Sequence, residues 1–211
     1  MRFLYMATGL TLYALGIVIM INTNMGYAPW EVFHVGLART TGLSIGVASI
    51  IAGIVIVIPV TLLGEKLGFG TIVSMILPGI VIDILFYTNV VPVTENIVNG
   101  IVMLITGLFI ITVGLYFYIK SAFGVGPRDN LIVVLARKTK FPIGLCRSMI
   151  ELLVTVIGWL LGGMVGIGTV ISVIAIGFFI QIIFKLFKFD VTAVKHETLS
   201  DTIRLLEIPK K

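Results

Sequence analysis

Charged residues are scarce in this chain of 211 residues. Only 12% of them are Asp, Glu, Lys or Arg, whereas 58% are hydrophobic, and about a quarter of the residues of an ordinary soluble domain are charged. So few charges cannot cover a globule of this size with polar surface. The composition therefore excludes a water-soluble protein and predicts an integral membrane protein whose main surroundings are the lipid bilayer.

Residue sets that carry out chemistry are also missing. The single cysteine, Cys146, excludes a disulfide bond within the chain, and no cluster of Cys and His has the spacing of a metal site. No Gly-Lys-Ser/Thr loop that would bind phosphate is present, and no Ser–His–Asp set stands out. We therefore expect no enzyme activity, no cofactor and no bound metal.

Long apolar stretches dominate the chain instead. A helix needs roughly 20 apolar residues to cross the hydrocarbon core of a bilayer. The first stretch resembles a signal peptide but has no small-residue cleavage site, so we expect it to be retained as a helix. The sequence predicts an all-α protein with six spanning helices, at residues 3–22, 45–63, 69–88, 98–119, 143–161 and 168–186.

The positive charges fall mainly on one side of this arrangement. With the N-terminus in the cytoplasm, only Arg39 lies on the outer side, and the inner side receives Arg2, Lys66, Lys120, Arg128, Arg137, Lys138, Lys140, Lys185 and Lys188. The positive-inside rule then predicts a cytoplasmic-membrane protein with both termini in the cytoplasm. Because these cations orient the chain, the formal net charge of +5 does not indicate a nucleic-acid partner.

The sequence contains an internal repeat. A shift of 98 positions (124 − 26) aligns residues 8–86 with 106–184 without a gap, and 26 of the 79 pairs are identical. Because each copy holds three spans, the second copy would cross the membrane in the opposite direction, as in many secondary transporters. We expect a first repeat at residues 1–96, an inverted second repeat at 97–186 and a cytosolic tail at 187–211.

A short helical segment follows the first span of each repeat. Residues 29–40 and 127–138 would be about 18 Å long as helices, too short to span. Each could be a re-entrant helix that enters the membrane and returns, or an interfacial helix lying flat. Glycine and proline suit irregular backbone buried against protein, which favours the re-entrant arrangement. The residues of this broken-helix motif are Gly26, Pro29, Trp30, Gly124, Gly126, Pro127 and Arg128.

In the re-entrant arrangement the two helix N-termini meet at mid-depth and form a candidate substrate or ion site. Each carries an acid in its first turn, Glu31 and Asp129, where the helix dipole favours negative charge. Asp83 and its repeat partner Gln181 would complete the site, because an ionisable group inside a span is a functional candidate. A structural hydrogen bond is the alternative for Asp83.

Three further residues are candidates for substrate or ion binding. Arg147 and Glu151 stand four positions apart on one helical face, so we expect them to pair. That pair would either lock the fold or contact substrate or ion. His34 could accept a proton, or it could simply lie at the membrane interface.

The segments "GYAPWEVFHVGLARTTGLSIG", "GFGTIVSMILPGIVID" and "GVGPRDNLIVVLARKT" resemble the YczE/YitT-like group of small bacterial six-helix membrane proteins. The chain departs from the first motif at Ala28, where the group has a second glycine, and at Glu31, where it has aspartate. The resemblance covers nearly the whole chain except the tail and implies a protein of the cytoplasmic membrane. Since the group is largely uncharacterised, it implies no substrate.

The repeat and the buried acids together predict a carrier of a small solute. The two repeats would rock about a central site, and its carboxylates would favour a cationic, zwitterionic or proton-coupled solute. Two other functions stay open: a subunit that captures solute for an ATP-driven importer, and a scaffold for another membrane complex. The sequence also leaves open a homodimer and partner membrane proteins.

Overall fold

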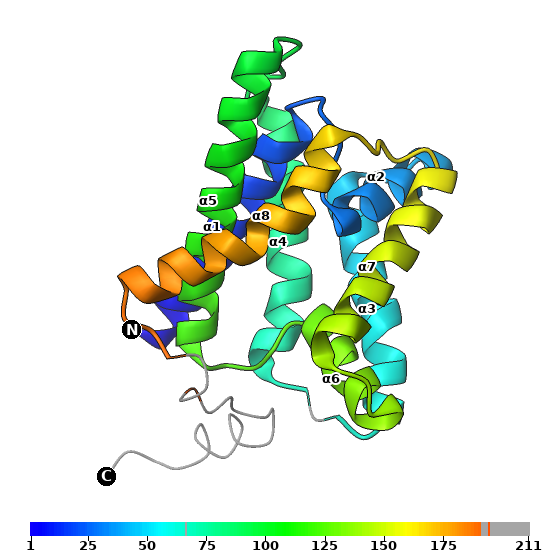
Figure 1. Cartoon of the computed structure of the whole chain (residues 1–211), viewed down its shortest axis with the longest axis vertical. Helices are drawn as coiled ribbons and strands as arrows, with labels where there is room; N and C mark the ends of the chain where they lie inside the picture. Colours follow the sequence, from blue (N-terminus) through cyan, green and yellow to red (C-terminus); the bar gives the residue numbers. More distant parts are fainter. Residues whose placement is uncertain (66, 191–193, 195–211) are drawn as a thin grey trace.

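The computed structural model describes residues 1–65, 67–190 and 194 (Figure 1). In this part of the chain every regular element is a helix, as predicted. Lys66 and most of the expected tail lie outside the described residues. The helices are α1 (Arg2–Ile21), α2 (Pro29–Thr41), α3 (Ile45–Leu62), α4 (Phe69–Thr88), α5 (Ile97–Ser121), α6 (Pro127–Thr139), α7 (Ile143–Leu160) and α8 (Ile167–Leu186).

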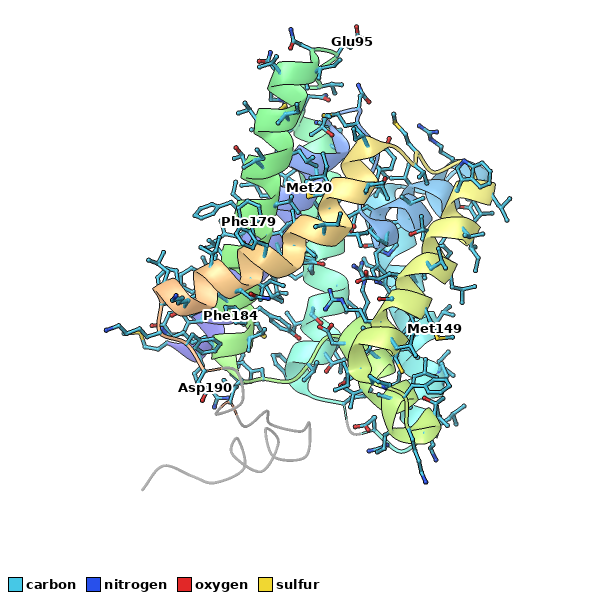
Figure 2. The ribbon with its side chains drawn as sticks, in the orientation of Figure 1. Met20, Glu95, Met149, Phe179, Phe184 and Asp190 are labelled. Atoms are coloured by element: carbon cyan, nitrogen blue, oxygen red, sulfur yellow. The ribbon has the colours of Figure 1, made fainter. Side chains whose placement is uncertain are left out.

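Six of these helices are long and apolar enough to cross a membrane: α1, α3, α4, α5, α7 and α8, within the described residues. This confirms the six predicted spans. Large apolar side chains on their outer faces stay uncovered, such as Leu62 (82% exposed) and Leu160 (73% exposed). In Figure 2, Met20 lies within the bundle and Met149 at its edge. Such surface suits lipid and would be unfavourable in water.

The helix boundaries recur at the interval of the sequence repeat. Moving α2, α3 and α4 forward by 98 positions (127 − 29, 143 − 45 and 167 − 69) gives the bounds of α6, α7 and α8. Local chemistry explains the shared starting points. A proline occupies the first position of α2 and α6, where its missing N–H costs nothing. Thr71 and Thr169 accept hydrogen bonds from the amides of Gly68 and Gly166, the residues directly before α4 and α8.

Helices α1 and α5 run antiparallel at very close range (Figure 1). A Cβ added to Gly16 would lie 2.7 Å from the carbonyl oxygen of Gly107, and one added to Gly9 would lie 2.7 Å from that of Gly114. Small residues let helix backbones approach in this way inside a membrane. The largest buried cluster of apolar side chains is built around this pair, with contributions from α4 and α8.

The short helices α2 and α6 lie at opposite ends of the pair formed by α3 and α7 (Figure 1). Each packs against both of these helices. Each has 13 residues, one more at its end than the segment predicted from sequence. This arrangement brings the first turn of α2 toward the first turn of α6, where the candidate site lies.

Candidate functional site

A cavity of about 100 Å³ lies beside the first turn of α6 and the second turn of α2. Because one water molecule needs a cavity of roughly 10–15 Å³, this cavity has room for several waters or one compact solute. Both halves of the chain line it. Its polar and ionisable lining comes from Tyr13, His34, Ser49, Ser74, Tyr118, Arg128 and Asp129.

The loops before α2 and α6 are held in place by backbone hydrogen bonds between the halves. The Gly168 amide donates to the Met25 carbonyl at 2.7 Å, and the Gly70 amide donates to the Phe123 carbonyl at 2.8 Å. The two bonds are equivalent under the repeat: Phe123 is the repeat partner of Met25 (25 + 98), and Gly168 is the repeat partner of Gly70 (70 + 98). In one bond the acceptor belongs to the first half, and in the other it belongs to the second half. Each loop therefore rests on the first turn of the last helix of the other half.

Glycine is required at the bend of both loops. Gly26 has φ +101° and Gly124 has φ +131°, a region that residues with a Cβ rarely adopt. A Cβ on Gly26 would also lie 2.4 Å from the Gly166 nitrogen. The motif glycines predicted from sequence thus allow both the turn and the close contact between the halves.

Arg128 is the centre of the polar cluster. One guanidinium nitrogen lies 3.2 Å from His34 Nε2, and another lies 3.6 Å from Glu31 Oε1 and 3.5 Å from the Tyr13 hydroxyl. The guanidinium also stands 4.7 Å above the Trp30 ring, a cation–π contact. Because arginine stays protonated, His34 Nε2 must accept, which makes His34 a neutral imidazole with its proton on Nδ1.

Glu31 is buried beside this cation. It is 6% exposed, and its Oε1 has no hydrogen-bond partner among the described residues. Burial raises the pKa of the Glu31 carboxyl, while the Arg128 charge lowers it in part. Burial likewise lowers the pKa of His34 well below its usual range, and Arg128 lowers it further.

Asp129 lines the same cavity with an exposed side chain. Within the described part of the chain no hydrogen bond or ion pair to its carboxylate is found. The structure therefore places Glu31 and Asp129 near each other, and it adds His34 and Arg128, which the sequence had not grouped with them. It leaves one carboxylate free to contact whatever enters the cavity.

The other predicted site residues do not line the cavity. Asp83 accepts hydrogen bonds from the Ser44 hydroxyl at 2.5 Å and the Gly46 amide at 2.8 Å, so it caps the start of α3. Gln181 is exposed on α8, and neither residue lines the cavity. Arg147 and Glu151 form the expected pair on α7, 2.8 Å apart.

Tyr13 and Ser74 were not singled out from the sequence, yet both line the cavity. Tyr13 places a hydroxyl in the middle of an apolar span, a signal for a polar contact inside a membrane. Ser74 is one of the identical positions of the repeat, paired with Ser172. Hydropathy alone could not reveal them, because single hydroxyl groups barely change the apolar character of a span.

Comparisons with known proteins place this arrangement in a family. Residues 1–185 match the model of a family of unknown function (DUF6198). The chain is 30% identical over 183 residues to the uncharacterized membrane protein YczE of Bacillus subtilis (strain 168), covering 86% of this chain and 84% of that protein. It is 29% identical to an uncharacterized protein of Haemophilus influenzae, covering 86% and 87% of the two chains.

A further relative is the uncharacterized protein YyaS of Bacillus subtilis, 27% identical over 176 residues, covering 82% of this chain and 87% of that protein. No solved structure matches the chain. The resemblance to the YczE-like group, expected from the paired motifs, is confirmed. The chain belongs to the DUF6198 family of membrane proteins, whose function is unknown.

Proposed function

We propose that the chain carries a small zwitterionic solute across the cytoplasmic membrane of a bacterium, by alternating access between two inverted repeats. The observation that carries this proposal is the cavity between the halves, into which Arg128 and Asp129 both reach. The proposal assigns no catalytic step to the chain and needs no cofactor. Both termini would lie in the cytoplasm.

Contacts between α1 and α5 in which repeat partners trade places support the inverted repeat. In the antiparallel pair α1 and α5, Gly9 meets Gly114 and Gly16 meets Gly107. The two contacts are equivalent under the repeat, because Gly107 is the repeat partner of Gly9 (9 + 98) and Gly114 is the repeat partner of Gly16 (16 + 98). Each contact thus joins one residue to the partner of the other. Exchanged contacts are what a two-fold axis produces. For two antiparallel spanning helices such an axis lies in the membrane plane, as in inverted-repeat transporters.

The meeting of α2 and α6 supports the re-entrant arrangement. At 1.5 Å per residue each helix is about 20 Å long. Flat helices on opposite faces would be separated by the roughly 30 Å hydrocarbon core. Arg128 of α6 and His34 of α2 nevertheless have side-chain nitrogens 3.2 Å apart, which favours two helices that enter the membrane from opposite sides.

The charges of the cavity favour a zwitterion. Arg128 has five N–H donors, more than its contacts with His34, Tyr13 and Glu31 use. A guanidinium of this kind suits a carboxylate, and the free Asp129 carboxylate suits an ammonium group. A cavity of about 100 Å³ limits the solute to a compact molecule.

Two links between the halves would control access. Arg39 donates to the Gly162 carbonyl at 2.7 Å, and Arg137 pairs with Glu65 at 2.7 Å. Arg39 and Arg137 are repeat partners at the outer ends of α2 and α6. When one half rocks against the other, either the Arg39–Gly162 contact or the Arg137–Glu65 pair has to break while the other stays formed.

Uptake by the purified chain in proteoliposomes tests the proposal. Radiolabelled glycine and glycine betaine are the zwitterionic probes, with choline as a cation and acetate as an anion. We expect uptake of at least one zwitterion, reduced more than tenfold in Arg128→Gln and in Asp129→Asn. Lys140→Gln is the matched control, because Lys140 is an exposed cation at the end of α6.

Three results would contradict the proposal. They are uptake of choline or acetate without either zwitterion, normal uptake by Asp129→Asn, and no uptake of any probe by chain whose folding is verified by thermal unfolding.

A further inference from the structure

We propose that Glu31 is the proton-binding site of the carrier, and that proton and solute are coupled because Glu31 and the solute carboxylate compete for Arg128. This inference rests on the proposed function. In the resting arrangement the Glu31 carboxylate is paired with Arg128. When a solute carboxylate occupies the guanidinium, Glu31 takes up one proton from water and becomes a neutral acid.

The contact between Glu31 and Arg128 is loose enough to be replaced. Their closest charged atoms are 3.6 Å apart, and Glu31 Oε1 makes no hydrogen bond among the described residues. A carboxylate in direct bidentate contact would approach to about 2.8 Å. A solute entering the cavity can therefore offer Arg128 a better partner than Glu31 does.

Loss of Arg128 as a partner would leave Glu31 as a buried charge. Glu31 is almost fully buried, and an isolated carboxylate in such surroundings is neutralised by a proton rather than kept ionised. The proton balances the exchange: one negative charge arrives with the solute carboxylate, and one is removed at Glu31. The net charge around Arg128 stays the same.

The other charged and titratable groups near Glu31 do not replace it in this role. Helix α7 contributes Arg147 and Glu151, which neutralise each other as a pair. Helix α1 contributes the Tyr13 hydroxyl, helix α6 contributes Asp129 beside Arg128, and α3 has no charged side chain.

His34, on the same helix, is unsuited to hold the proton. Its Nε2 already accepts from Arg128 at 3.2 Å, so protonation there would place two cations in contact.

Trp30 provides a built-in reporter of Arg128. The chain has two tryptophans, and the second, Trp159, is 61% exposed on α7. The variant Trp159→Phe therefore leaves Trp30, with the guanidinium 4.7 Å from its ring, as the sole tryptophan. A solute that draws Arg128 away from Glu31 will change the Trp30 fluorescence.

The test uses the Trp159→Phe chain in detergent, with glycine and acetate as probes. Acetate carries the carboxylate alone, so it tests the competition for Arg128 even if the solute is not a zwitterion. We expect at least one probe to change Trp30 fluorescence and to cause uptake of about one proton per chain, measured with a pH indicator in weak buffer. Between pH 8 and pH 6 the apparent affinity should strengthen by up to tenfold per pH unit, as binding linked to one proton requires.

Glu31→Gln should keep the fluorescence response and lose both the proton uptake and the pH dependence. Asp83→Asn is the matched control and should keep all three, because Asp83 lies away from the cavity. Should Glu31→Gln fail to fold, the pH dependence of the parent chain decides. The inference is overturned if neither probe causes proton uptake, or if Glu31→Gln retains it.

Failure of the carrier proposal would look different. Proton-linked binding without uptake into proteoliposomes would refute the carrier and leave the proton site intact. Uptake that stays equally pH-dependent in Glu31→Gln would refute the proton site and leave the carrier.

Discussion

Arg137 and Glu65 form an ion pair, with a guanidinium nitrogen 2.7 Å from Glu65 Oε1, that joins the end of α6 to the connection between α3 and α4. The repeat partner of Arg137 makes a different link, from Arg39 to the Gly162 carbonyl. The two ends of the molecule are thus tied by equivalent arginines to non-equivalent partners. Each link can be removed by a single substitution.

Glu65→Gln should make the cavity more accessible from the side of α6, because it removes the ion pair with Arg137 that joins the halves at that end. A cysteine replacing the cavity residue Ser74, in a Cys146→Ala background, would be labelled several-fold faster by an impermeant maleimide from that side. Arg39→Gln should accelerate labelling from the opposite side. The stability cost should stay near 0.2–1 kcal/mol, since Arg137 is largely exposed. Equal rates from both sides in both variants would argue against gating.

Gly16→Ala should destabilise the bundle by about 1–3 kcal/mol, the usual cost of overpacking. The added Cβ would lie 2.6 Å from Ile111 Cγ1 and 2.7 Å from the Gly107 carbonyl oxygen. Gly177→Ala in α8 is the control, because nothing lies within 4 Å of its Cβ position. Thermal unfolding in detergent measures both. A similar melting temperature for the two variants would contradict close packing of α1 on α5.

Gly26→Ala should lower the stability of the protein by more than the strain of its positive φ angle alone explains. Gly42 also has a positive φ, +73°, but nothing lies within 4 Å of its Cβ position, so Gly42→Ala reports the backbone cost, about 1–2 kcal/mol. At Gly26 the contact with Gly166 is added to that cost. Comparing the two melting temperatures separates the effects. Equal losses would mean that the loop does not rest tightly on α8.

Labelling of single cysteines tests the predicted topology. In a Cys146→Ala background, Val93→Cys lies between α4 and α5 and Lys140→Cys lies just after α6, and both positions are exposed. The positive-inside rule predicts that an impermeant maleimide labels Val93→Cys in intact cells. Lys140→Cys should react only after permeabilisation. Labelling of both positions from the same face of the membrane would contradict the inverted repeat, and with it the proposed carrier function.

Asp83→Ala should reduce stability by about 1 kcal/mol, because the start of α3 loses the acceptor for the Ser44 hydroxyl and the Gly46 amide. We expect solute uptake per folded molecule to be unchanged. Ser44→Ala is the comparison, and it should cost at least as much, because it removes the donor to Asp83 and also the acceptor of the Val47 amide at the start of α3. A loss of uptake with unchanged stability would show that Asp83 acts in substrate transport and does not only stabilise α3.

Several features could be predicted from the sequence because they depend on local composition. Span length follows from runs of apolar residues, and the starts of α2 and α6 follow from proline at the first helical position. The repeated helix bounds follow from the repeated sequence. The pairing of Arg147 with Glu151 needed only the spacing of a helix.

Which residues share the cavity was decided by the tertiary structure alone. Glu31 and Asp129 were predicted to meet as first-turn acids, and Asp83 and Gln181 were added because polar groups inside a span are functional candidates. Packing turns Asp83 toward α3 and leaves Gln181 on the outside. The same packing brings the Tyr13 hydroxyl to Arg128 across 115 positions of the chain. Hydropathy reports how far a residue lies from water, whereas its neighbours depend on how separate helices meet.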